Sequence, residues 1–97
     1  MHKIKEPFFY WLKKDLEQFG KNRNVKIFIF GSSLKEKNFY DIDVGVSGEV
    51  TTEELFYLKE QLTESNLPYI VDIINFNQVK NNFKENIFNN EILWIKP

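Results

Sequence analysis

The sequence contains no cysteine, and its single histidine is His2. Without cysteine the chain forms no disulfide, no thiolate metal site and no thiol nucleophile, and its composition suits a reducing cytoplasm, where we expect the protein. With its one histidine beside the N-terminus, no serine is expected to have a histidine base in a nucleophilic triad. The motifs G-x-x-x-x-G-K-[ST], G-x-G-x-x-G and G-x-S-x-G are also missing, which excludes the P-loop, Rossmann and hydrolase-elbow sites.

Long apolar runs and a charge excess are missing as well. No apolar run approaches the length of a signal-peptide core or a membrane span, so we expect no membrane association. Lysine and arginine number 13 against 14 aspartates and glutamates, giving a formal net charge of -1. Such a balance offers no electrostatic footprint for long nucleic acid.

The residues that are present predict one folded domain over residues 1–97. Hydrophobic residues make up 42% of the chain, aromatic residues 16% and charged residues 28%. A chain of this length and composition supports a single hydrophobic core with a charged surface.

Apolar residues at helical spacing predict three helices. The first is predicted to begin at Pro7 and to end at Gly20. The second begins at Thr51, where Thr51 and Glu54 match a capping box, and the third is capped by Asn77. The predicted buried stripes are Phe8, Leu12, Leu16 and Phe19 in the first helix, Leu55, Leu58 and Leu62 in the second, and Val79, Phe83 and Ile87 in the third.

Four consecutive aromatic residues, Phe8, Phe9, Tyr10 and Trp11, open the first helix. One apolar stripe cannot bury all four. Two explanations stay open: the domain covers this helix on two sides, or part of the helix meets another chain, either a partner protein or a second copy.

Three apolar segments predict strands: Val25 to Phe30, a segment with Ile42, Val44 and Val46 on one face, and Tyr69 to Asn75. The short link between the first two favours an antiparallel pair, and the helix between the second and third permits a right-handed parallel crossover. The last segment, EILWIK, adds either a short edge strand or an extended tail. The sequence therefore predicts an α/β (α+β) fold with a small mixed sheet of three to four strands and helices packed on it.

Three aspartates and a glycine-serine turn carry the candidate chemistry. Asp41 and Asp43 are two residues apart in a strand and share a face, and Gly31-Ser32 ends the preceding strand. A helical turn after Ser32 would point free N–H groups toward an anion. Asp72 interrupts an apolar strand, where a carboxylate requires a partner. A solvated strand face for the first two, and an edge position or a salt bridge to a lysine for Asp72, are the structural alternatives.

Three carboxylates in one site repel one another unless divalent cations neutralise them. Ligands that are all oxygen atoms select Mg²⁺ first and Mn²⁺ second. Two such cations, about 3.5 to 4 Å apart, activate an attacking oxygen and stabilise a leaving one. Such a site suits phosphoryl or nucleotidyl transfer.

The combined motifs resemble the minimal nucleotidyltransferases of the DNA polymerase β superfamily. Phe30-Gly31-Ser32, Asp41-Ile42-Asp43 and Val71-Asp72-Ile73 match the family pattern, and the resemblance covers nearly the whole chain. It implies the nucleotidyltransferase fold, Mg²⁺ (or Mn²⁺) as cofactor and ATP as substrate. The implied catalytic residues and metal ligands are Asp41, Asp43 and Asp72, and the implied nucleotide-binding residues are Gly31, Ser32 and Ser33. The spacer from Ser33 to Tyr40 is shorter than in most of the family and lacks the family's arginine and glycine.

Stand-alone domains of this family are often antitoxins that transfer AMP to a tyrosine of a HEPN-domain toxin. The resemblance therefore implies transfer of a nucleoside monophosphate, AMP from ATP, to a hydroxyl of such a partner protein. The short spacer keeps a second interpretation open, in which a weak or inactive site leaves a binding module that neutralises its partner by complex formation. Transfer to a small molecule is a third, for which the chain has no separate substrate domain.

Overall fold

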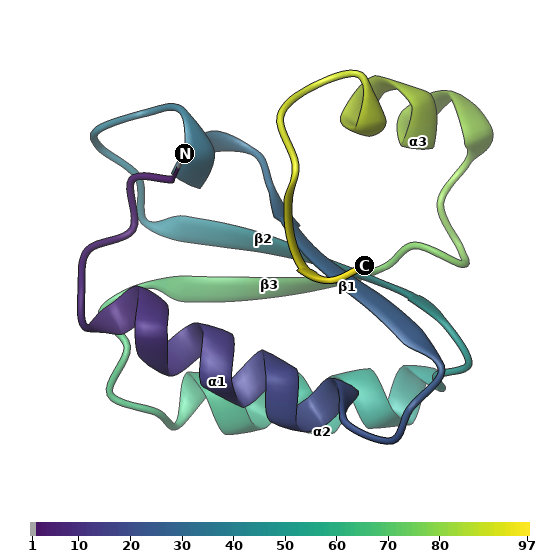
Figure 1. Cartoon of the computed structure of the whole chain (residues 1–97), viewed down its shortest axis with the longest axis horizontal. Coiled ribbons are helices and arrows are strands. Elements are labelled where there is room, and N and C mark those ends of the chain that lie inside the picture. Colours follow the sequence, from purple (N-terminus) through teal and green to yellow (C-terminus); the bar gives the residue numbers. More distant parts are fainter. Residues whose placement is uncertain (1) are drawn as a thin grey trace.

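Four strands form one mixed sheet in the order β3-β2-β1-β4 (Figure 1). The computed structural model describes residues 2–97. β1 pairs antiparallel with both β2 and β4, whereas β2 and β3 are parallel. This arrangement confirms the predicted fold class, and the C-terminal segment forms the short edge strand. The strands are β1 (Val25–Phe30), β2 (Asp41–Gly48), β3 (Ile70–Asn75) and β4 (Leu93–Lys96).

Two helices, α1 (Phe8–Gly20) and α2 (Thr52–Thr63), cover one face of the sheet, and α3 (Asn81–Phe88) lies over the other (Figure 1). The predicted stripe residues Leu12 and Leu16 of α1 are buried, as are the three predicted leucines of α2. They pack against the side chains that β1 and β2 present to this face, and together they form the main core. Alternate strand residues point toward α3 instead. α3 covers this face only in part, because none of its residues is buried and Phe83, predicted for its buried stripe, is 42% exposed. The contacts of the main core include Ile27, Ile29, Ile42, Val44, Val46, Leu55, Leu58 and Leu62.

The start of α2 is fixed by the predicted capping box. The Thr51 hydroxyl accepts a hydrogen bond from the Glu54 N–H at 3.0 Å, and the Glu54 carboxylate accepts one from the Thr51 N–H at 2.9 Å. Each bond satisfies an N–H group that the first helical turn leaves without a partner. The predicted starts of α1 and α2 were each off by one residue: Pro7 and Thr51 precede the helices as caps, and Phe8 and Thr52 are the first helical residues.

The predicted start of α3 at Asn77 is wrong. The helix begins at Asn81 after Lys80, and Asn77 lies in the preceding turn. The Asn77 side-chain amide donates to the Gly48 carbonyl at 2.9 Å and accepts from the Gly48 N–H at 3.0 Å. Asn77 therefore joins the turn after β3 to the end of β2, an alternative that asparagine side chains offer to helix capping.

A second, aromatic core lies between the sheet and α3. Phe28, Phe30 and Phe76 are buried there, and the Phe28 and Phe76 rings meet edge to face with centroids 4.7 Å apart. Gly45 of β2 makes room for them, because a Cβ at this position would lie 2.3 Å from Phe28 Cζ and 2.9 Å from Phe76 Cδ1. Asp43 is two residues before Gly45 in β2, so the aromatic core and the candidate site lie on the same face of the sheet.

The four aromatic residues at the start of α1 divide into two pairs. Phe8 and Phe9 are half-buried and pack against the main core. Tyr10 and Trp11 remain 56% and 42% exposed. The domain thus covers the helix only in part. Within residues 2–97, no helix is both long and apolar enough to cross a membrane.

Candidate active site

β2 places Asp41 and Asp43 on the face of the sheet opposite α1 and α2. Its residues alternate, with Ile42 and Val44 buried in the main core. Asp41 is the first residue of the strand and is exposed, whereas Asp43 is half-buried. The local sequence thus orients both carboxylates away from the main core, as the two-residue spacing predicts.

Asp72 lies directly beside Asp43. The two residues are register partners in the parallel pair of β2 and β3, so their Cα atoms are neighbours at about the 4.8 Å spacing of paired strands. Paired residues of neighbouring strands project to the same face of a sheet. The fold therefore brings the three predicted aspartates together, although Asp72 is about thirty residues from the other two in sequence. We call these three residues the aspartate cluster.

The electrostatics of the cluster follow from this proximity. Burial raises the pKa of Asp43 above its ordinary value, and the negative charges of Asp72 and then Asp41 raise it further. A raised pKa means that ionised Asp43 interacts unfavourably with its surroundings. A bound cation would offset the energetic cost of burying this charge and would reduce the repulsion between the carboxylates.

Gly31 lies against the Asp43 carboxylate. Its φ angle is +89°, a conformation that glycine adopts without strain, and a Cβ at this position would lie 2.6 Å from Asp43 Oδ2. The predicted helical turn follows directly as η1 (Ser32–Leu34), a single 3₁₀ turn. Gly31 thus borders the aspartate cluster, and Ser32, the first residue of η1, directly follows it.

Ser33 occupies a different environment. It is fully buried, and its hydroxyl has no hydrogen-bond partner, whereas its carbonyl accepts from the Lys3 N–H at 2.9 Å. A buried hydroxyl without a partner is uncommon. Contact between Ser33 and a triphosphate stays a prediction, and it requires a movement of the η1 turn.

Lys59 of α2 is a site residue that the sequence motifs did not predict. Its ammonium group donates to Asp72 Oδ1 at 3.1 Å and to the Val71 carbonyl at 2.7 Å. A lysine partner for Asp72 was one of the structural alternatives. The sequence feature that could have pointed to this partner is that Lys59 is the single basic residue of the predicted second helix.

The aspartate cluster fits a divalent cation in its chemistry but not in its present side-chain positions. Three carboxylates supply the oxygen ligands that Mg²⁺ and Mn²⁺ prefer. However, no three acidic or histidine side chains of residues 2–97 are arranged to hold one ion. Asp72, turned toward Lys59, would have to turn toward Asp43 to complete such a site.

A basic and aromatic cleft adjoins the start of β2. It has a volume of about 390 Å³, and no acidic residue lines it. Tyr40, which directly precedes Asp41, forms part of its wall with a side chain that is 80% exposed. The lysines and aromatic rings of this cleft suit a ligand that is anionic and aromatic. The lining residues are Lys3, Lys5, Phe8, Lys37, Asn38, Phe39, Tyr40, Pro68 and Tyr69.

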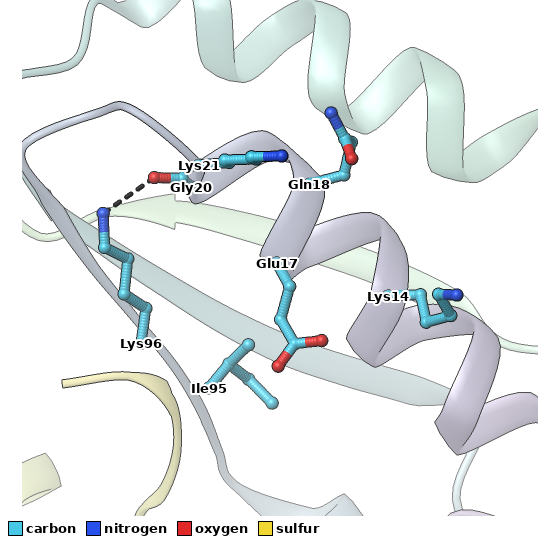
Figure 2. Close-up of a pocket in the computed structure, with 7 residues that line it drawn as sticks. All are labelled: Lys14, Glu17, Gln18, Gly20, Lys21, Ile95 and Lys96. Carbon is cyan, nitrogen blue, oxygen red and sulfur yellow. Dashed lines mark hydrogen bonds between the residues drawn. The ribbon is translucent and has the colours of Figure 1, made fainter.

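A second groove, of about 410 Å³, lies between the end of α1 and β4 (Figure 2). Lys96 crosses its end and donates to the Gly20 carbonyl at 2.7 Å. β4 is the edge strand farthest from β3. The groove is therefore separate from the aspartate cluster, and its lysine ties the last strand to the first helix.

The mixed sheet, with paired aspartates beside a glycine turn, has the features of a domain for phosphate-transfer chemistry. A family model described as polymerase beta, nucleotidyltransferase matches residues 14–96. The chain belongs to this nucleotidyltransferase family, as the motifs predicted. The match spans Gly31 and all three aspartates and begins within α1. No curated protein matches the chain significantly.

Proposed function

We propose that the protein transfers a nucleoside monophosphate, AMP from ATP, to a hydroxyl of a partner protein in a Mg²⁺-dependent reaction. The main support is the register of β2 and β3, which pairs Asp43 with Asp72 next to Gly31. Membership of the nucleotidyltransferase family supports the reaction class. The raised pKa of Asp43 agrees with a carboxylate set suited to cations.

Each residue has a separate role in this proposal. Asp41, Asp43 and Asp72 hold the cations, which supply Lewis-acid activation and charge neutralisation when bound. Gly31 lets the triphosphate approach the backbone, and the Ser32 hydroxyl donates a hydrogen bond to it. The acceptor oxygen forms a bond to the α-phosphorus while the bond from that phosphorus to pyrophosphate breaks. An Asp72 carboxylate oxygen receives the proton of the acceptor hydroxyl.

The acceptor in this proposal is a HEPN-domain toxin, which makes the protein its antitoxin. Four exposed aromatic side chains on α1 and α2 support an interaction with another protein: Tyr10, Trp11, Phe56 and Tyr57. Exposed aromatic side chains of this kind are enriched at protein interfaces. The basic cleft beside Tyr40 would accommodate an aromatic and acidic acceptor segment.

Labelling with two forms of ATP tests this function. The protein is incubated with the product of the neighbouring gene, Mg²⁺ and ATP labelled at either the α- or the γ-phosphate. We expect α-label on the partner, and about a 100-fold or larger loss with the double variant Asp41→Asn/Asp43→Asn. Equal labelling by the variant, γ-label alone, or no labelling by the wild type would contradict the proposal.

The second candidate function is neutralisation by binding alone. It is supported by the pairing of Asp72 with Lys59. It is also supported by the exposed aromatic residues of α1 and α2, which lie on the face of the sheet opposite the aspartate cluster. Co-expression of a toxic partner separates the two functions. If the double variant protects cells as well as the wild type does, binding is sufficient; if protection is lost while the complex still forms, transfer is required.

A further inference from the structure

The ion pair between Lys59 and Asp72 joins the two faces of the sheet. α2 lies on the face of the main core, where its neighbouring residue Leu58 is buried. Asp72 projects to the opposite face, together with Asp43. β3 is an edge strand, paired with β2 alone. The Lys59 side chain therefore reaches Asp72 by passing around the free edge of β3.

The two hydrogen bonds of Lys59 differ in how easily they can change. Its bond to the Val71 carbonyl, at 2.7 Å, is made to a backbone atom that the sheet holds in place. Its bond to Asp72 Oδ1, at 3.1 Å, is made to a side chain that is 45% exposed and can rotate. The first bond keeps the ammonium group at the strand edge, so Asp72 can leave it and return to it.

The aspartate cluster thus has two ways to neutralise Asp72. In one, Asp72 is paired with Lys59, and no three side chains of residues 2–97 are placed to hold an ion. In the other, Asp72 turns toward its register partner Asp43 and shares a cation with it. Opposite charges favour both states, and Asp72 must weaken one interaction to gain the other.

We propose that Lys59 is an internal counter-ion that competes with the divalent cation for Asp72. Lys59 stabilises the cation-free protein by offsetting one of the three negative charges, and it lowers the affinity of the cluster for the cation. Lys59 is a positioning residue in this mechanism, because it acts through Asp72. The inference depends on the proposed function for the role of Asp72 as a metal ligand.

Replacement of Lys59 by methionine tests the competition, since methionine keeps an apolar stem of similar length without the charge. Mn²⁺ is titrated into the nucleotide-free protein and followed calorimetrically. We expect the Lys59→Met variant to bind Mn²⁺ about three- to fivefold more tightly than the wild type, the scale set by a partly exposed ion pair. Lys13→Met is the matched control: it removes the same charge from an exposed position of α1 and should leave the affinity unchanged.

Thermal unfolding provides a second readout. Without cation, we expect Lys59→Met to unfold at a lower temperature than the wild type, and saturating Mn²⁺ should reduce that difference. A merely structural role would lower the unfolding temperature equally in both conditions. Unchanged or weaker Mn²⁺ binding by Lys59→Met would overturn the inference, as would a tightening of the same size in Lys13→Met. If Lys59→Met does not fold, Lys59→Gln replaces it under the same criteria.

Failure of this inference and failure of the proposed function are distinguishable. If wild-type protein transfers AMP but Lys59→Met does not change Mn²⁺ affinity, the competition is wrong and the function stands. If wild-type protein binds Mn²⁺ without transferring AMP, the function is wrong, and the comparison of affinities still decides the role of Lys59.

Discussion

At the scale of single residues, Asp43 has the most constrained environment of the three aspartates. Gly31 lies against its carboxylate, Asp72 is its register partner, and Asp41 precedes it by two residues on the same face. All three aspartates were predicted from their motifs. Their side-by-side placement depends on the register of two strands separated by α2, because a shift of one residue would turn Asp72 to the other face.

The raised pKa of Asp43 predicts how stability depends on pH in the cation-free protein. Folding raises this pKa from its ordinary value of 3.8, so between that value and the raised one the folded state binds more protons than the unfolded state. The contribution of Asp43 to stability is therefore fully present below pH 3.8 and is lost as the pH rises through the raised pKa.

Chemical denaturation in the presence of a chelator measures this effect. We expect Asp43→Asn, which cannot ionise, to lack this loss and to become more stable relative to the wild type as the pH rises from about 4 to 7. A stability difference that does not change with pH, or one that changes in the opposite direction, would contradict the assigned environment of Asp43.

At the scale of helices and strands, the sequence correctly predicted the features that depend on neighbouring residues alone. The limits of β1 and the capping box of α2 agree with the prediction, since both follow from neighbouring residues. The start of α3 was wrong because Asn77 bonds to Gly48, a residue distant in sequence. The Lys59–Asp72 pair could not be assigned either, because it requires the packing of α2 beside an edge strand.

The close packing of β2 against the aromatic core at Gly45 can be tested by a single substitution. A Cβ at this position would overlap the Phe28 ring in the aromatic core beneath α3, and Phe28 is held by several other rings. We expect Gly45→Ala to lower the free energy of unfolding by about 1 to 3 kcal/mol. Ser47→Ala, on the same face of β2, serves as control and should stay within about 0.5 kcal/mol. A Gly45→Ala variant as stable as its control would contradict the packing of this core.

At the scale of the whole molecule, two surfaces lie on different sides of the sheet. The aspartate cluster projects to one face, whereas Tyr10, Trp11, Phe56 and Tyr57 are exposed on the two helices that cover the other. Family membership applies to residues 14–96, which include both surfaces apart from Tyr10 and Trp11. Under the proposed function, transfer takes place at one surface of the domain and partner binding at the other.

The most direct measurement of the central claim is calorimetric titration of ATP with and without Mg²⁺. If the aspartate cluster and Gly31 form a metal-dependent triphosphate site, wild-type protein binds ATP in the presence of Mg²⁺, and a chelator abolishes that binding. Asp43→Asn should weaken it by about tenfold or more. ATP binding that needs no Mg²⁺, that persists unchanged in Asp43→Asn, or that does not occur in the wild type would contradict the claim.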